Sequence, residues 1–218
     1  MNILISIDGA CRDNGKPHCV SSSGAFVTVY DSANTLCSTE TFDCCEEESS
    51  NQRGEMKALI LALSRCCYED ASDVRIITDS EYIFNAMTKQ WYARWQRTGW
   101  KTANGDPVKN QDLWEEIISL VDLVGDAEIS YYHIKGHIIP TGAVTSAALL
   151  SNDKTGLALM KYCEEQYDKY RSTKVQEKLE HLQEVSEKNN GFPFEESILR
   201  QFVVMNSVAD VIAVEALE

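Results

Sequence analysis

The sequence predicts a mixed α/β domain in which crossover helices link strands of a single sheet. Three observations support this fold class. Strand-like segments open the chain at residues 3–8, 24–31 and 35–43, and residues 73–80 form a short apolar run typical of a strand buried on both faces. Amphipathic helical segments separate the later strands, as expected for a sheet that contains parallel strands.

The first helix is predicted within residues 49–67, after the three-stranded meander. Ser49 or Ser50 stands where an N-cap is expected, since a hydroxyl there accepts a hydrogen bond from a free backbone N–H. Helical spacing puts a carboxylate, Glu55, on the apolar stripe. The other members of the stripe are Ala58, Leu59, Ala62 and Cys66.

The second half continues the alternation of helix and strand. Ser80 is placed to cap a helix over residues 81–88, and residues 110–124 are amphipathic. A last strand is predicted at 127–136, and a final helix runs from residue 198 to the end of the chain.

Composition limits the classes of protein to consider. With 218 residues and 44% hydrophobic side chains, the chain can bury a full core, and a formal net charge of -14 argues against non-specific nucleic-acid binding. No apolar run approaches the roughly 20 residues of a membrane span, and Asp8 interrupts any signal-peptide core. We therefore expect a cytoplasmic protein without membrane contact. Eight cysteines without a CxxC motif are expected to be reduced thiols.

One segment, residues 89–110, departs from this acidic background. It carries three tryptophans, and its five basic residues against one acidic residue give a local charge of +4. A positive, aromatic surface of this kind suits contact with sugars and phosphates.

Four carboxylates lie in unusual positions for acids. Asp8 and Asp79 end strands, whereas Glu55 and Asp210 lie on apolar helical stripes; Asn206, Ala213, Val214 and Leu217 complete the stripe of Asp210. Inward carboxylates repel one another and lose solvation, so the group requires cations or protons. Hard oxygen ligands at the carboxyl ends of parallel strands suit Mg²⁺ or Mn²⁺. The pattern predicts metal-dependent phosphoryl transfer.

Six motifs occur in an order that resembles the type 1 ribonucleases H, above all the bacterial kind with a basic protrusion. The resemblance covers residues 1–137 and resumes at about 202–217. It implies a ribonuclease H-like fold, with a five-stranded mixed sheet in the order 3-2-1-4-5 flanked by helices, that cleaves the RNA strand of RNA/DNA hybrids. The motifs are "IDGACRDNG", "SNQRGEMKALILAL", "ITDSEYI", "QWYARWQRTGWKTANGDPVKNQDLWEEI", "HIKGH" and "NSVADVIAVEAL".

The resemblance also implies the catalytic groups. Asp8, Glu55, Asp79 and Asp210 match the four metal-binding carboxylates, which hold two Mg²⁺ ions, with Mn²⁺ as the alternative. Two-metal hydrolysis leaves 5′-phosphate and 3′-hydroxyl ends. His137 matches a loop histidine that shuttles protons or helps product to leave.

Substrate contacts follow from the same resemblance. The residues that match contacts to the sugar-phosphate backbones are Cys11, Asn14, Ser50, Asn51 and Gln52. The residues of the basic protrusion that match DNA-strand contacts are Arg94, Trp95, Arg97, Trp100 and Lys101. The tryptophans, Trp91 among them, could equally form the core of the protrusion. Glu81 departs from the family, which often has glutamine there.

The main departure is a long insertion before the last helix. We predict a catalytic domain at 1–137 and 202–218 and a mostly helical insertion at 138–201. The insertion could be a lid, an arm that contacts the hybrid, a dimerisation element or a binding site for replication proteins. Residues 147–190 have the pattern of charged helix with sparse apolar anchors, and their near-neutral charge balance favours a protein contact over phosphate binding. The insertion also contains Asp153, a rival to Asp210 as fourth carboxylate.

Two other functions remain open from the sequence. The chain could be a catalytically silent hybrid-binding or interaction module, although all four acids are present. It could also cut DNA on the same kind of sheet. The sequence favours a hybrid-specific ribonuclease that acts on primers or transcripts during DNA replication.

Overall fold

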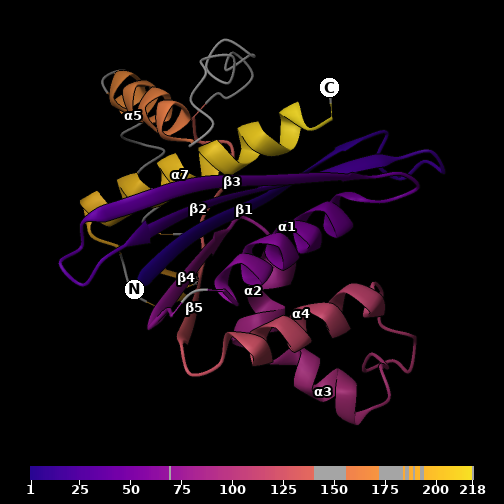
Figure 1. Cartoon of the computed structure of the whole chain (residues 1–218). Helices are drawn as coiled ribbons and strands as arrows, with labels where there is room; N and C mark the ends of the chain where they lie inside the picture. The colour runs from indigo at the N-terminus through magenta and orange to yellow at the C-terminus, as the bar shows by residue number, and fades with distance from the viewer. Residues whose placement is uncertain are drawn as a thin grey trace.

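The computed structural model confirms a mixed sheet covered by helices on both faces (Figure 1). Its strands are β1 (Asn2–Arg12), β2 (Val20–Tyr30), β3 (Leu36–Glu46), β4 (Asp73–Thr78) and β5 (Glu128–His133). The strand order is β3-β2-β1-β4-β5, as predicted; the first three strands are antiparallel, and β4 and β5 run parallel to β1. The structure describes residues 1–68, 70–139, 156–171, 184, 187, 188, 190, 191 and 194–217.

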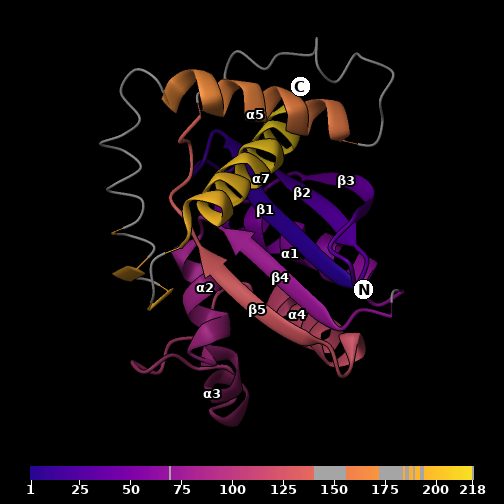
Figure 2. The same ribbon diagram turned by 90° about the vertical axis from the view of Figure 1, so that its left-hand side faces the viewer.

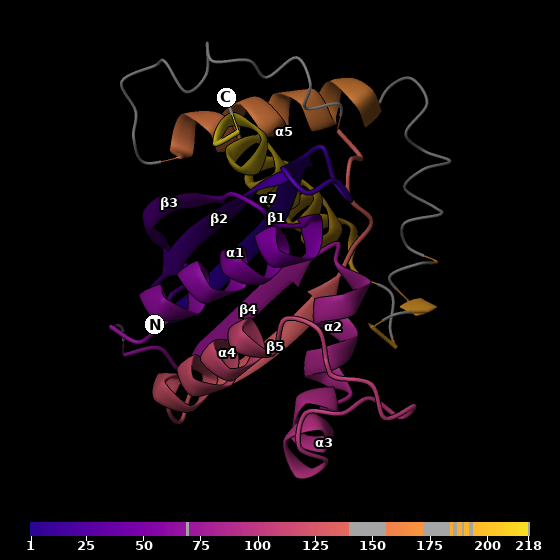
Figure 3. The same ribbon diagram turned by 90° about the vertical axis from the view of Figure 1, so that its right-hand side faces the viewer.

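Helices form a layer on each side of this sheet. Their bounds are α1 (Asn51–Cys66), α2 (Glu81–Thr88), α3 (Trp91–Arg97), α4 (Gln111–Val124), α5 (Leu157–Arg171) and α7 (Glu196–Glu215). Figures 1 and 2 show α1 and α4 on one face and α7, with α5 across it, on the other. In Figure 3, α3 projects beyond α2, on the side of the molecule away from α5.

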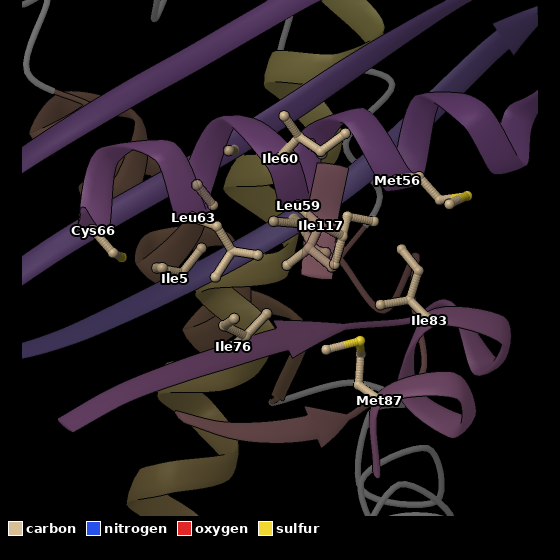
Figure 4. Packing of buried hydrophobic residues seen from close by; sticks show 14 of the residues in the cluster. Ile5, Met56, Leu59, Ile60, Leu63, Cys66, Ile76, Ile83, Met87 and Ile117 are labelled. Carbon is tan, nitrogen blue, oxygen red and sulfur yellow. The ribbon is translucent and has the colours of Figure 1, made fainter. Parts of the chain in front are cut away.

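Alternation along β1 divides the interior into two cores. Ile3, Ile5 and Ile7 pack with α1 and α4 in one buried cluster, whereas Leu4 packs with α7 and α5 in the other. Figure 4 shows the first cluster, where Leu59 and Leu63 of α1 lie over the sheet. Because successive strand side chains point to opposite faces, Asp8 shares the α7 side with Leu4.

Ser50 is the N-cap of α1, which confirms one of the two predicted positions: its side chain accepts a hydrogen bond from the Arg53 N–H at 3.4 Å. The predicted stripe of α1 is also confirmed, with the four apolar members buried and Glu55 partly buried beside them.

The final helix, α7, begins at Glu196, two residues before the predicted start. Asn206, Asp210 and Ala213 are buried as predicted, but Val214 is 45% exposed, so the predicted stripe is wrong at that position. The sheet still contacts the helix here, since the Ser22 hydroxyl donates to the Ala213 carbonyl and the Cys45 thiol to the Ala216 carbonyl, so Val214 lies on the side of the helix that faces solvent. By length and composition α7 could cross a membrane, which the sequence reading overlooked, but 72% of its apolar window is buried inside the fold, as in a core helix.

Helix α5 anchors the described part of the insertion to α7. Leu159, Cys163 and Tyr167 are buried against it, and Arg200 of α7 forms an ion pair with Asp168 at 3.0 Å. The predicted pattern of charged helix with apolar anchors therefore holds for α5. Residues 147–155, 172–183, 185, 186 and 189 of the predicted pattern lie outside the described residues.

The cysteine prediction is wrong for one pair. Cys11 and Cys19 form a disulfide, because the turn between β1 and β2 folds back and brings their Cα atoms to 6.8 Å. The six remaining cysteines are free thiols, as expected.

Candidate active site

The sheet register brings the two strand-end aspartates together. Ile7 of β1 pairs with Thr78 of β4, so Asp8 and Asp79 follow side by side at the carboxyl ends of two parallel strands. Asp8 also pairs with Gly24 of β2. A Cβ at Gly24 would lie 2.3 Å from the Ala209 carbonyl oxygen, so this glycine permits the close approach of α7 that carries Asp210 to Asp8.

A second glycine admits α1 to the same place. A Cβ at Gly9 would lie 2.4 Å from the Glu55 backbone nitrogen. The start of α1 therefore rests directly on the strand residue after Asp8, and the side chain of Glu55 reaches the carboxylate group. Neither glycine was predicted to have this role.

Asp8 is buried, with 5% of its surface exposed, the same fraction as for Asp210. The Gly9 N–H donates to its Oδ1 at 2.7 Å, while Oδ2 is buried and has no hydrogen-bond partner. Burial raises the pKa of Asp8 well above its ordinary value, and the charges of Asp79, Asp210 and Glu55 raise this pKa further. The four predicted metal ligands thus act on one another electrostatically at a single site.

Two donors hold the carboxylate of Glu55. The Ser80 hydroxyl donates to Oε2, and the Asn51 side-chain amide donates to Oε1 at 3.0 Å. Burial raises the pKa of Glu55 to about 7, while the Ser80 hydrogen bond opposes the increase. Ser80 does stand at the N-cap of α2, but its side chain makes no cap hydrogen bond, so the predicted capping role is wrong. Its hydroxyl donates to Glu55 instead.

Asp79 lies against the loop that follows β5. Burial raises the pKa of Asp79, the charge of His137 opposes the increase, and Asp210 adds to it. A Cβ at Gly136 would lie 1.8 Å from Asp79 Oδ2, so any larger residue there would displace this carboxylate. The loop and the carboxylate are in direct contact.

His137 reaches the fourth predicted ligand. Its Nδ1 lies 3.2 Å from Asp210 Oδ2. The imidazole is 74% exposed, whereas the Asp210 side chain is only 7% exposed. His137 also has a left-handed backbone, with φ of 55°. The predicted proton carrier therefore stands at the boundary between solvent and the buried carboxylates.

The donor set fits a hard divalent cation. Within the described residues, no three His, Cys, Asp or Glu side chains already lie at metal-ligand spacing. The buried Oδ2 of Asp8 nevertheless has no hydrogen-bond partner, and the charges of the other three carboxylates raise the pKa of Asp8. Oxygen ligands with uncompensated negative charge are those that Mg²⁺ and Mn²⁺ take in proteins.

The residues predicted to contact the hybrid backbone gather around the start of α1. The Asn51 N–H points to the Asn14 side-chain oxygen at 3.5 Å, and Gln52 is exposed beside them. Asn51 and Ser50 already have internal roles, at Glu55 and at the N-cap. The sulfur of Cys11 lies in the disulfide, so the structure offers no free thiol for a substrate contact.

The basic protrusion is built on a row of aromatic rings. The centroid of the Trp95 ring lies 5.5 Å from that of the buried Trp114 of α4, with the two rings tilted by 57°, and it lies 6.1 Å from that of Trp91 and 6.5 Å from that of Trp100. These half-buried tryptophans pack against the main core, which favours the scaffold interpretation. The predicted cationic contacts Arg94, Arg97 and Lys101 are all exposed.

Glu81 is exposed at the first position of α2, two residues from Asp79. Asp153 lies outside the described residues. His133, for which the sequence predicted no role, is buried, and its Nε2 lies 3.1 Å from the Asp79 carbonyl oxygen. No sequence motif marks this histidine, because its contact depends on how the strands align.

Comparison with known proteins identifies one family. The family model described as RNase H matches residues 2–147. The ribonuclease H of Nitratidesulfovibrio vulgaris is 43% identical over 143 residues, which cover 62% of this chain and 78% of that protein. The ribonuclease H of Chlorobaculum parvum is 36% identical over 136 residues, which cover 62% of this chain and 83% of that protein.

Solved structures share the fold. LC9-RNase H1, described as a type 1 RNase H with the type 2 active-site motif, has a TM-score of 0.52 at 23% identity, covering 68% of this chain and 71% of its own. The PFV RNase H domain has a TM-score of 0.50 at 19% identity, covering 72% and 91%. At these identities the likeness concerns the fold alone.

Proposed function

This chain belongs to the ribonuclease H family, and from that membership we propose that it hydrolyses the RNA strand of RNA/DNA hybrids. We further propose a two-metal-ion mechanism that leaves 5′-phosphate and 3′-hydroxyl ends. One observation carries the proposal: at the carboxyl ends of the parallel strands, the charges of Asp79, Asp210 and Glu55 raise the pKa of the buried Asp8. A hydrolase of this family needs such a concentration of carboxylates.

The four carboxylates would hold Mg²⁺, or Mn²⁺ in its place. When bound, the ions supply positive charge that keeps the acids ionised, activates water and stabilises the leaving oxygen. Around them, Ser80 and Asn51 orient the carboxylate of Glu55 before any ligand arrives. A preoriented ligand loses less entropy when the site fills.

His137 is the proposed proton carrier. An imidazole can accept a proton at one ring nitrogen and release it to solvent. The contact of Nδ1 with Asp210 at 3.2 Å orients the ring, and its high exposure gives access to solvent and to a departing product.

The proposed hybrid contacts divide into two groups. Polar groups at the start of α1 would bind the sugar-phosphate backbones near the carboxylates, and the protrusion would bind the DNA strand. In the protrusion, Arg94, Arg97 and Lys101 are the proposed phosphate contacts, while Trp95 and Trp100 would offer ring edges to sugars from their half-buried positions. A replication-protein contact through the insertion remains a prediction.

Cleavage of end-labelled substrates tests the proposed function. We expect the RNA strand of a hybrid to be cut with Mg²⁺, no cutting in EDTA, and none of duplex DNA or duplex RNA. Asp8→Asn, which removes the charge at the centre of the site, should bind the hybrid without cutting it. Binding of the hybrid by the wild-type chain without cleavage would favour the silent-module alternative, and cleavage of duplex DNA would favour a DNA-cutting enzyme.

A second experiment tests the fourth carboxylate. The family model ends at residue 147, before both Asp153 and Asp210. Asp210 is favoured because it contacts His137 and because its charge raises the pKa of Asp8. We expect Asp210→Asn to abolish cleavage and Asp153→Asn to leave it intact. The reverse pattern would assign the role to Asp153.

A further inference from the structure

Among the described residues, β5 is the outermost strand on this side of the sheet, and no described strand pairs with its outer backbone edge. The Ile134 N–H donates to the Thr78 carbonyl at 3.1 Å, toward β4. Backbone groups of adjacent strand residues point to opposite edges, so the N–H and carbonyl of His133 point outward. Buried backbone groups of this kind require other partners.

Asn190, from the insertion, is the partner of both groups. Its Oδ1 accepts from the His133 N–H at 3.0 Å, and its Nδ2 donates to the His133 carbonyl at 3.0 Å. A carboxamide presents one acceptor and one donor side by side, as a peptide group does. One side chain, 57 residues away in sequence, therefore replaces a neighbouring strand at this point.

Neighbouring residues fix the place of Asn190. Gly191 has a left-handed φ of 83°, and its N–H donates to the Glu187 carbonyl at 2.9 Å, which ends a helical turn directly after Asn190. Phe194 is buried, with its ring 5.8 Å from that of Tyr132 on β5. The segment is thus packed on the residue that precedes His133.

His133 transmits this constraint to the candidate active site. Its Nε2 lies 3.1 Å from the Asp79 carbonyl oxygen; since a carbonyl only accepts, Nε2 donates. The buried imidazole also lies 5.6 Å from the ring of Phe84 in α2. The backbone of Asp79 is therefore linked through one histidine to the insertion.

We propose that Asn190 is a positioning residue for Asp79. By holding the end of β5, it keeps the His133 imidazole on the Asp79 carbonyl and keeps the following loop, with Gly136 and His137, against the carboxylates. The inference rests on the proposed function, since it takes Asp79 as a metal ligand. Asn190 would thus give the insertion a role in positioning an active-site residue, independent of any other contact that the insertion makes.

The test uses the full chain and two independent measurements. The variants are Asn190→Ala, His133→Phe, which keeps a ring of similar size without the donor, and their combination. Glu187→Ala is the matched control, an exposed residue on the same segment. Mg²⁺ affinity is measured by calorimetry without hybrid, and kcat and KM are measured on a labelled hybrid.

We expect Asn190→Ala to weaken Mg²⁺ binding roughly tenfold and to lower kcat by a similar factor, because partners behind metal ligands typically contribute 10–100-fold. KM for the hybrid should not change. The double variant should be no worse than the worse single variant, since both act through one contact. If Asn190→Ala does not fold, Asn190→Asp keeps the acceptor, loses the donor and should show a smaller loss.

Three results would overturn the inference: a folded Asn190 variant with wild-type Mg²⁺ affinity and kcat, fully additive losses in the double variant, or no Mg²⁺ binding by the wild-type chain. A purely structural role would lower thermal stability and leave the Mg²⁺ affinity of the folded protein unchanged. If the chain binds Mg²⁺ but cuts no hybrid, the proposed function fails, while the calorimetric comparison still decides the role of Asn190.

Discussion

Replacing Glu55 with glutamine should stabilise the metal-free protein at alkaline pH. Burial raises the pKa of this carboxyl to about 7 from an ordinary value of 4.5, so the folded state favours the protonated form. Below pH 4.5 the group is neutral in both the folded and unfolded states and carries no penalty. As pH rises from about 4.5 through about 7, the unfolded chain ionises first and folding stability falls.

The magnitude follows from the two pKa values. Their difference, at about 1.36 kcal/mol for each pH unit, corresponds to about 3 kcal/mol of lost stability above pH 7. Glutamine keeps the shape of the side chain and cannot ionise. The oxygen of its carboxamide can also accept from Asn51, and the nitrogen can donate to the Ser80 hydroxyl, which rotates to accept.

Urea unfolding in EDTA measures this effect. At pH 8 we expect Glu55→Gln to unfold with a free energy about 3 kcal/mol larger than wild type, and at pH 4 the two should agree within about 0.5 kcal/mol. Glu116→Gln, at an exposed position of α4, is the control and should match wild type at both pH values. Saturating Mg²⁺ should reverse the order, because only the carboxylate gains from the cation. An equal difference at pH 4 and pH 8 would refute the titration of Glu55 in this window.

Two further predictions concern activity. Gly136→Ala should lower kcat by at least tenfold while the chain stays folded, because the added Cβ would occupy the position of Asp79 Oδ2. Steady-state kinetics and a thermal melt measure the two effects. A wild-type kcat would contradict the contact between the loop and the carboxylate. Neutralising Arg94, Arg97 and Lys101 together should raise KM at physiological salt far more than it lowers kcat, because these exposed cations lie away from the carboxylates. An unchanged KM would remove the protrusion from the proposed binding surface.

Local patterns were sufficient to predict most elements of the fold. The two-residue period of β1 and the helical stripe of α1 each specify which side chains face inward, and both are confirmed. Five strands in the order 3-2-1-4-5 followed from the motif resemblance and are also confirmed. The period of β1 and the stripe of α1 depend on residues close in sequence, so their signal survives without tertiary information, whereas the strand order was available only through the resemblance.

Side-chain hydrogen bonds were less accessible to prediction. Ser80 has the sequence signature of a helix cap, yet Glu55 competes successfully for its hydroxyl from another helix. The disulfide between Cys11 and Cys19 depends on how a turn folds back. In each case two local interpretations are chemically equivalent, and the choice depends on a neighbour that the local sequence does not contain.

By itself, the sequence determined the sheet, its covering helices and the four carboxylates that occupy inward positions. Only the tertiary structure decided that Gly9, Gly24 and Gly136 allow backbones to approach those carboxylates, and that Asn190 closes the edge of β5 behind Asp79. The physical reason is range. Periodicity and propensity act over a few residues, whereas steric fit and hydrogen-bond pairing join residues that become neighbours only when the chain has folded.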